Sequence, residues 1–230
     1  MKKTLAVLLA ALMLLALVPA VAEEAEAPVV YVTIANGELV AAQIEVELTD
    51  VDEDGALTIA DALYLAHEAA FEGGAEVGFA DAMGEYGLML TKLWGVENGG
   101  SYGYYVNNEA AMGLADPLED GDFVNAFVYT DTAAFSDTYA FFDEFDALAG
   151  EVTLTLYAAG YDANWAPVTN PVAGAVITVN GEKTEAVTDE NGKATLTVQA
   201  GDVVSAVSDS QTLVPPCCVI LAVEDLEDAA

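Results

Sequence analysis

The sequence predicts a mainly β protein with one helix, divided into an α+β unit and a following β-sandwich. Short runs rich in Val, Ile, Thr and Tyr, separated by Gly, Asn and Asp, recur along most of the chain. Apolar residues follow a helical spacing over residues 58–71. From residue 151 onward the chain contains further short strands and no helical period, which favours a sandwich.

The charge balance excludes several classes of partner. The 230 residues include 39 Asp and Glu against 5 Lys and Arg, and 54% of them are apolar. Nucleic acids and anionic membranes would repel such a chain, because binding them requires clustered basic residues. The apolar content is high enough to form cores, so intrinsic disorder is also disfavoured.

Residues 1–22 have the parts of a secretory signal peptide. Two Lys precede an apolar run over residues 5–18, and Ala20 and Ala22 stand at the small-residue positions of a cleavage site. The run is shorter than the roughly 20 residues that span a bilayer, which disfavours an uncleaved anchor. We therefore expect Sec-type export to the cell surface or the extracellular space, and no membrane span in the mature chain.

The first unit is expected to form a sheet with one packed helix. Residues 29–34 and 40–48 alternate as strands around the turn at Asn36-Gly37, which predicts a hairpin. Thr58 and Asp61 form a possible capping box at the start of the helix. Further strands are predicted at 88–94, 102–106 and 123–129.

The second unit is expected to begin after a segment rich in aromatic residues. A flexible linker would not contain five such rings, so this segment should pack on one or both units. Strands are predicted beyond it at 152–157, 175–179, 184–187, 194–198, 203–207 and 217–223. The expected division is a signal peptide at 1–22, a short acidic linker at 23–28, an α+β domain at 29–131, a connecting segment at 132–150, a β-sandwich at 151–224 and an acidic tail at 225–230.

Two family resemblances refine this prediction. The first is carried by Leu93-Trp94-Gly95, Tyr104-Tyr105-Val106-Asn107-Asn108, Leu118-Glu119-Asp120-Gly121-Asp122-Phe123-Val124 and Phe127-Val128-Tyr129. This pattern resembles the transcobalamin C-terminal-like domains of bacterial exported proteins, with Asn108 where the family usually has Gly. The resemblance implies a β-grasp-like fold. Related animal transport proteins close such a domain over a cobalamin. The matching residues here are mostly strand and turn residues, so the resemblance does not predict cobalamin binding by this chain.

The second resemblance covers the sandwich. Gly174-Ala175-Val176-Ile177-Thr178-Val179-Asn180-Gly181 and Thr188-Asp189-Glu190-Asn191-Gly192-Lys193-Ala194-Thr195-Leu196 look like the Ig-like modules of bacterial surface proteins. In those modules a Thr-Asp-x-x-Gly turn leads into a strand. The resemblance implies an Ig-like β-sandwich that acts as a spacer or display scaffold.

The segment 50–61 has the spacing of an EF-hand-like Ca²⁺ loop. Asp50, Asp52 and Asp54 occupy loop positions 1, 3 and 5, Ala56 supplies the backbone carbonyl at position 7, and Asp61 stands at position 12. The alternative is an acidic turn in which Thr58 and Asp61 cap the following helix. Calcium is slightly favoured, because closely spaced carboxylates repel one another without a cation.

A cluster of aromatic residues is the candidate ligand site. Trp94, Tyr102, Tyr104 and Tyr105 lie beside Gly99-Gly100 and would offer a stacking surface. In a strand, Tyr102 and Tyr104 share one face and Tyr105 takes the other, so core packing is the competing interpretation.

Catalysis has little support in the sequence. His67 is the only His, its helical neighbours favour a surface or interface position, and no Ser or Cys occupies a nucleophile turn. Cys217 and Cys218 are adjacent, which disfavours two ordinary core thiols because neighbouring strand residues point to opposite faces. A vicinal disulfide, one buried and one exposed thiol, and an intermolecular bridge remain the alternatives.

We therefore expect an exported, non-catalytic binding or adhesion-type protein that recognises another protein, a glycan or a small molecule. The alternative is a carrier that captures a small ligand such as a corrinoid. An aromatic-lined cleft at the edge of the first unit would favour the carrier.

Overall fold

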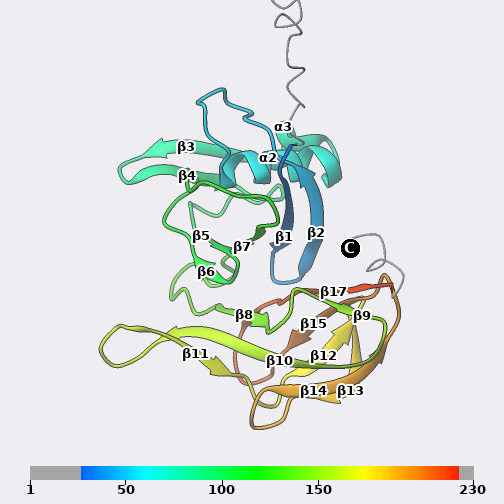
Figure 1. Ribbon diagram of the computed structural model, residues 1–230. Helices are drawn as coiled ribbons and strands as arrows, with labels where there is room; N and C mark the ends of the chain where they lie inside the picture. Colours follow the sequence, from blue (N-terminus) through cyan, green and yellow to red (C-terminus); the bar gives the residue numbers. More distant parts are fainter. Residues whose placement is uncertain (1–26, 223–230) are drawn as a thin grey trace, which may run out of the picture.

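The computed structural model describes residues 27–222 as two units in contact, one above the other in the view of Figure 1. The expected signal peptide, residues 23–26 of the acidic linker and the acidic tail lie outside these residues. The mainly β composition is confirmed. Within the described range, no helix combines the length and the apolar character that crossing a membrane requires.

The first unit is built on a mixed sheet of the order β2-β1-β7-β5-β6. The central strands β1 and β7 are parallel, and the other neighbours are antiparallel. The unit thus has the sheet that the sequence predicts. The strands are β1 (Val29–Ala35), β2 (Leu39–Glu47), β5 (Tyr102–Val106), β6 (Glu109–Ala110) and β7 (Phe123–Val128).

Helix α2 (Ile59–Ala70) packs its apolar side chains against β1 and β2. Ala62, Leu63 and Ala66 are fully buried in the core that it shares with the sheet. The capping box is confirmed, because Thr58 Oγ1 accepts from the Asp61 N–H and the Asp61 side chain accepts from the Thr58 N–H. The helix therefore begins where the sequence predicts.

The predicted helix is present, and a second, five-residue helix α3 (Gly74–Gly78) that the sequence did not indicate follows it. It begins after Gly73, whose φ of +94° is readily adopted by glycine, and it is too short to show a helical period. A separate hairpin of β3 (Ala80–Gly84) and β4 (Gly87–Lys92) comes next. The sequence indicated β4 but not β3, whose Ala, Asp and Gly residues disfavour strands.

The second unit encloses one core between two sheets, as Figure 1 shows in its lower half. One sheet has the order β11-β10-β8-β16 with β14 also paired to β10, and the other has the order β13-β12-β15-β17-β9. Both sheets contribute to the core, for example with Leu156 from β10 and Ile177 from β12. The strands are β8 (Thr138–Phe142), β9 (Asp146–Leu148), β10 (Gly150–Tyr161), β11 (Pro167–Pro171), β12 (Val176–Val179), β13 (Glu182–Val187), β14 (Lys193–Val198), β15 (Val203–Val207), β16 (Leu213–Val214) and β17 (Cys218–Leu221).

The segment expected to connect the units belongs largely to the second. Its strand β8 pairs with β10 and β16, and its strand β9 pairs with β17 in the opposite sheet. The second unit therefore begins by Thr138 rather than at residue 151. The segment is rich in aromatic residues because it forms strands that pack into cores.

A small third core joins the units. Ala35 and Phe127 of the first unit are buried against Tyr139 and Val214 of the second. Gln43 also donates its side-chain N–H to the carbonyl of Phe145, with Nε2 and O 2.5 Å apart. The junction is thus packed with side chains and does not depend on a flexible linker.

Candidate functional site

A cleft of about 670 Å³ opens between the two units, within the range of about 300 to 1,000 Å³ that is typical of small-molecule sites. We call it the junction cleft. Its aromatic rings come from separate elements: β5, the end of β7, the turn before β8, β8 itself and the end of β10. They are Tyr105, Tyr129, Phe135, Tyr139 and Tyr161.

The rings of the junction cleft are held in defined orientations. Tyr105 and Tyr139 stack in parallel, with centroids 3.6 Å apart and planes inclined by 6°. Tyr129 and Phe135 meet edge to face, with centroids 5.3 Å apart and planes inclined by 85°. The Tyr139 hydroxyl donates to Asn108 Oδ1 across the junction, at 2.9 Å. The wall of the cleft is therefore built before any ligand arrives.

Two of the rings are largely free to meet a ligand. Phe135 is 54% exposed and Tyr161 is 64% exposed, whereas Tyr139 is buried. Exposed aromatic rings next to a buried aromatic wall favour binding, because they can cover a ligand that rests on the wall.

The polar groups of the cleft are neutral hydroxyls and acids. Burial raises the pKa of Tyr105 to about 12, and burial together with the charge of Asp137 raises the pKa of Tyr129. Both phenols are therefore protonated at neutral pH. Asp137 is buried and accepts hydrogen bonds from the Thr130 N–H and hydroxyl and from the Asp131 N–H.

Of the four aromatic residues expected at the ligand site, only Tyr105 lines the junction cleft. Trp94 packs against His67 and Phe71, with both centroid distances 5.1 Å. The Tyr102 hydroxyl lies 2.8 Å from the carbonyl oxygens of both Thr91 and Val96.

Tyr102 and Tyr104 pack on the main core of the first unit, whereas Tyr105 packs on the junction core. The alternation of side chains along β5 explains this division. The structure therefore does not bring the four residues together in one place. Tyr105 instead lines the cleft with Tyr129, Phe135, Tyr139 and Tyr161, and the aromatic content of the segment 132–150 was a signal that could have pointed to two of these four.

The acidic loop at residues 50–61 brings three carboxylates together. Oxygens of Asp50, Asp52 and Asp54 all lie within 4.8 Å of one another. Asp50 accepts from the N–H of Gly55, whose φ is +92°, and Asp54 accepts from the Ala56 N–H. These three carboxylates could hold a hard cation, since Ca²⁺ takes oxygen ligands from such turns.

Asp61 does not join this group. It is 2% exposed, one of its carboxylate oxygens accepts from the Val51 N–H, and the other accepts from the N–H and hydroxyl of Thr58. The structure thus gives Asp61 the capping role that was the alternative to a twelfth-position ligand. Its negative charge still reaches the loop, because desolvation and the charges of Asp54, Asp61 and Asp50 raise the pKa of Asp52.

His67 is fully buried, so the expected surface or interface position was wrong. Its Nδ1 lies 2.6 Å from the Leu63 carbonyl oxygen, and its Nε2 accepts from the Trp94 N–H at 2.9 Å. Because Nε2 accepts, the ring is neutral with its proton on Nδ1. Burial lowers the pKa of His67 accordingly. The loop at Trp94 and helix α3 cover the face of α2 that carries His67. The periodicity of the sequence did not indicate that this face is buried.

Cys217 and Cys218 are free thiols, and both are buried. The sequence disfavoured two buried core thiols, yet this is the arrangement in the structure. Cys217 and Cys218 do not form the vicinal disulfide that was one of the alternatives. Adjacent side chains do point to opposite faces. Both faces are covered, because Cys218 lies in the sandwich core and Cys217 lies beside Thr33 of the first unit. Burial raises the pKa of each thiol to about 12.

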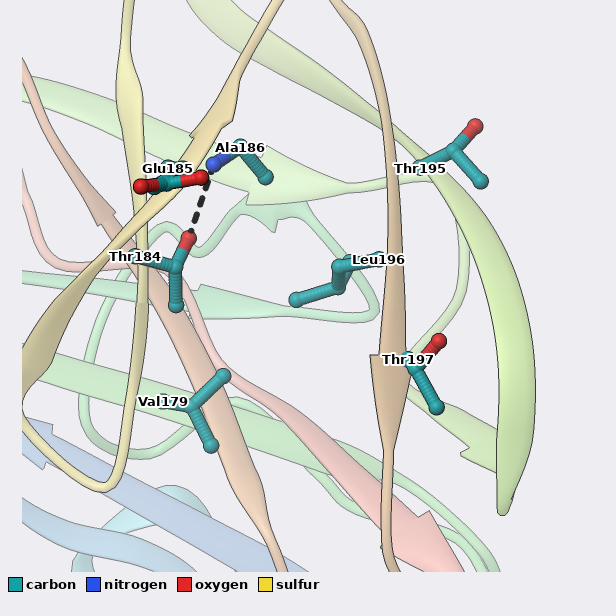
Figure 2. Close-up of a pocket in the computed structure, with 7 residues that line it drawn as sticks. All are labelled: Val179, Thr184, Glu185, Ala186, Thr195, Leu196 and Thr197. Atoms are coloured by element: carbon teal, nitrogen blue, oxygen red, sulfur yellow. Dashed lines mark hydrogen bonds between the residues drawn. The ribbon is translucent and has the colours of Figure 1, made fainter.

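Another hollow, of about 480 Å³, lies where β13 and β14 run beside each other. Figure 2 shows Leu196 directed into this space, while Thr195 and Thr197 point away from it. Thr184 Oγ1 accepts from the Ala186 N–H at 3.1 Å. No aromatic ring lines the hollow among the described residues, so it is less suited to ligand binding than the junction cleft.

Comparison of the chain with protein-family models, curated proteins and solved structures gives no match.

Proposed function

We propose that the chain is an exported, non-catalytic binding protein that captures a small ligand in the junction cleft. The observation that carries this proposal is the cleft itself, with its volume of about 670 Å³ and its five aromatic rings. Drug-sized ligands occupy clefts of about 300 to 1,000 Å³ that combine apolar walls with a few polar groups. The carrier function, which was the alternative, is thereby favoured over a featureless scaffold.

The chemistry of the reactive side chains supports a role without catalysis. Both nitrogens of His67 are occupied, and the side chain is buried away from the cleft. Cys217 and Cys218 have raised pKa values and are protonated at neutral pH, whereas a nucleophilic cysteine acts as the thiolate. A general base paired with an exposed nucleophile is not formed by these residues.

The test uses the exported chain, residues 23–230, and a panel of glycans, cobalamins and small organic ions. Thermal shift identifies a ligand, and calorimetry then compares the Tyr161→Ala and Phe135→Ala variants with the unaltered protein. Val187→Ala is the control, because Val187 is a 50% exposed apolar side chain on β13 that does not line the cleft. We expect both cleft variants to weaken binding and the control to leave it unchanged. Binding that is insensitive to both cleft variants would contradict the proposal.

An adhesion-type function is a second candidate, and the β3–β4 hairpin favours it. Met83 and Tyr86 are 77% and 89% exposed, and Val77 of the neighbouring α3 is 54% exposed. Exposed apolar side chains that gather on one element favour contact with another macromolecule. Retention of protein-coated beads on glycan or protein surfaces should then fall in a Met83→Ser, Tyr86→Ser variant, and persist in a Tyr161→Ala variant.

Calcium completes the proposed function as a structural ion. Asp50, Asp52 and Asp54 would hold it, together with the backbone carbonyl of Ala56, and its charge would offset the repulsion among the carboxylates. The ion would stabilise the turn that precedes α2, on the side of the first unit that carries the capping box.

A further inference from the structure

The junction cleft has an electrostatic preference. Its charged lining residues in the described chain are Glu109 and Asp137, and neither Lys92, Lys183 nor Lys193 lines it. The chain contains no Arg, and its formal charge is −34. An anionic ligand would meet repulsion from the lining and from the whole protein, whereas a cation would be attracted.

The rings of the cleft offer the surface that an organic cation requires. The negative face of an aromatic ring attracts a cation within about 6 Å of its centroid. Tyr129 and Phe135 meet nearly at a right angle, and the stacked pair of Tyr105 and Tyr139 supplies another wall. Several rings in different orientations can surround one cationic group, whereas a single flat ring surface contacts it from one side only.

The hydrogen-bonding groups of the cleft distinguish between kinds of cation. The carboxylate of Asp137 already accepts three hydrogen bonds from the protein. A primary ammonium brings three N–H donors and is strongly hydrated, and Asp137, whose oxygens are already hydrogen-bonded, could replace little of that water. A quaternary ammonium has no N–H donor. It needs only aromatic faces and nearby negative charge.

Building on the proposed function, we propose that the junction cleft binds the quaternary ammonium group of a small molecule. The group would rest against Tyr105, Tyr129 and Phe135, with Tyr161 covering it from the exposed side. Asp137 supplies negative charge behind Tyr129 without a direct ion pair, and Glu109 supplies it at the rim. Part of the cleft volume of about 670 Å³ is then left for the rest of the ligand.

Calorimetry on the exported chain at low ionic strength tests this proposal with choline as the probe. Its uncharged isostere 3,3-dimethylbutan-1-ol has the same shape, so the difference between the two reports the charge. We expect choline to bind about tenfold more tightly, which corresponds to about 1.4 kcal/mol. Equal binding of the two compounds, or no binding of choline, would overturn the proposal.

Variants locate the bound cation. Phe135→Ala and Tyr161→Ala should each weaken choline binding several-fold, while their thermal unfolding stays close to that of the unaltered protein because both side chains are largely exposed. Glu109→Gln should weaken binding less, and Val187→Ala, outside the cleft, should not change it. Choline binding that survives both ring variants would place the cation elsewhere on the acidic surface and overturn the proposal.

The same measurements separate this inference from the proposed function. If another ligand of the panel binds and depends on Phe135 and Tyr161 while choline does not bind, the cleft is a ligand site but not a site for quaternary ammonium. If choline and every other panel member fail to depend on these two rings, both proposals are overturned.

Discussion

The ring of Tyr105 on β5 lies parallel to the ring of Tyr139 on β8, with 3.6 Å between their centroids. The first strand belongs to the first unit and the second strand to the sandwich. The main aromatic wall of the junction cleft is therefore shared between the units. Their relative position determines whether the cleft exists, so the stability of the junction and ligand binding should be linked.

Replacing Tyr139 should weaken the junction. Tyr139→Ala removes a ring that is 5% exposed and its hydrogen bond to Asn108, at an expected cost of about 3 to 5 kcal/mol in the free energy of unfolding. Tyr139→Phe keeps the ring and loses only the hydrogen bond, at a cost of about 0.5 to 1.5 kcal/mol. Urea unfolding measures both. Equal losses in the two variants would show that the stacked ring does not stabilise the junction.

The capping box should contribute measurably to stability. Thr58→Ala removes the hydroxyl that accepts from the Asp61 N–H, and we expect a loss of about 0.5 to 2 kcal/mol in the free energy of unfolding. Thr132→Ala is the control, since Thr132 is exposed and outside α2. Denaturant unfolding measures the free energy of unfolding of both variants. A loss in Thr132→Ala as large as that in Thr58→Ala would argue against a specific cap.

Calcium should stabilise the first unit through the acidic loop. For a dissociation constant of about 10⁻⁴ to 10⁻³ M, roughly millimolar Ca²⁺ adds about 0.4 to 1.4 kcal/mol and shifts melting by several degrees. Sodium at equal ionic strength should not reproduce the shift. Replacing Asp50 and Asp54 by Asn should abolish it.

A double variant of Glu53→Gln and Glu72→Gln removes as much charge, and it is the matched control because both residues are exposed and lie outside the carboxylate group. It should keep the calcium-specific shift. Absence of any heat of Ca²⁺ binding in calorimetry would leave the loop as an acidic turn that precedes the cap.

His67 should make stability depend on pH. Burial lowers its folded pKa below the ordinary value of 6.5, so the unfolded chain binds the proton more readily. The stabilisation is complete above about pH 6.5 and is lost as the pH falls below it, with a slope of up to about 1.4 kcal/mol per pH unit. Urea unfolding between about pH 7.5 and 5 measures this slope.

A His67→Gln variant isolates the contribution of the imidazole. Glutamine can donate and accept hydrogen bonds but does not titrate, so the variant should lose this part of the slope, although its stability at neutral pH will fall. Acidic groups with raised pKa values, such as Asp52 and Asp81, remain in both proteins and cancel in the difference. An unchanged slope would mean that His67 does not cause the pH dependence.

The two thiols should be unreactive in the folded protein. Burial raises the pKa of both Cys217 and Cys218 to about 12, so almost no thiolate forms near pH 8. A thiol-reactive aromatic disulfide should label neither residue until denaturant is added, and should then label both. Intact mass before labelling distinguishes two thiols from a disulfide. Rapid labelling under native conditions, or a mass lower by two hydrogens, would contradict the structure.

Local patterns accounted for much of the fold. The hairpin around Gly37, the capped helix at Thr58 and most strands depend on residues close together in the chain, so periodicity and turn residues were sufficient to predict them. The grouping of Asp50, Asp52 and Asp54 follows for the same reason, since one loop contains all three. Strands β3, β6, β8, β9, β11 and β16 were not predicted. Five of them are very short or mostly exposed, and the consecutive aromatic residues of β8 show no alternation of polar and apolar residues.

The sequence by itself determined the mainly β fold, the helix cap and the acidic loop, because each arises from local spacing. Tertiary structure alone decided what covers each face. The alternation of side chains along a strand places Tyr105 on the face opposite Tyr104, and Cys217 on the face opposite Cys218. It could not show that the sandwich packs against Tyr105, or that the first unit packs against Cys217. The burial of His67 and the formation of the junction cleft likewise depend on contacts between distant segments, which a periodic pattern does not encode.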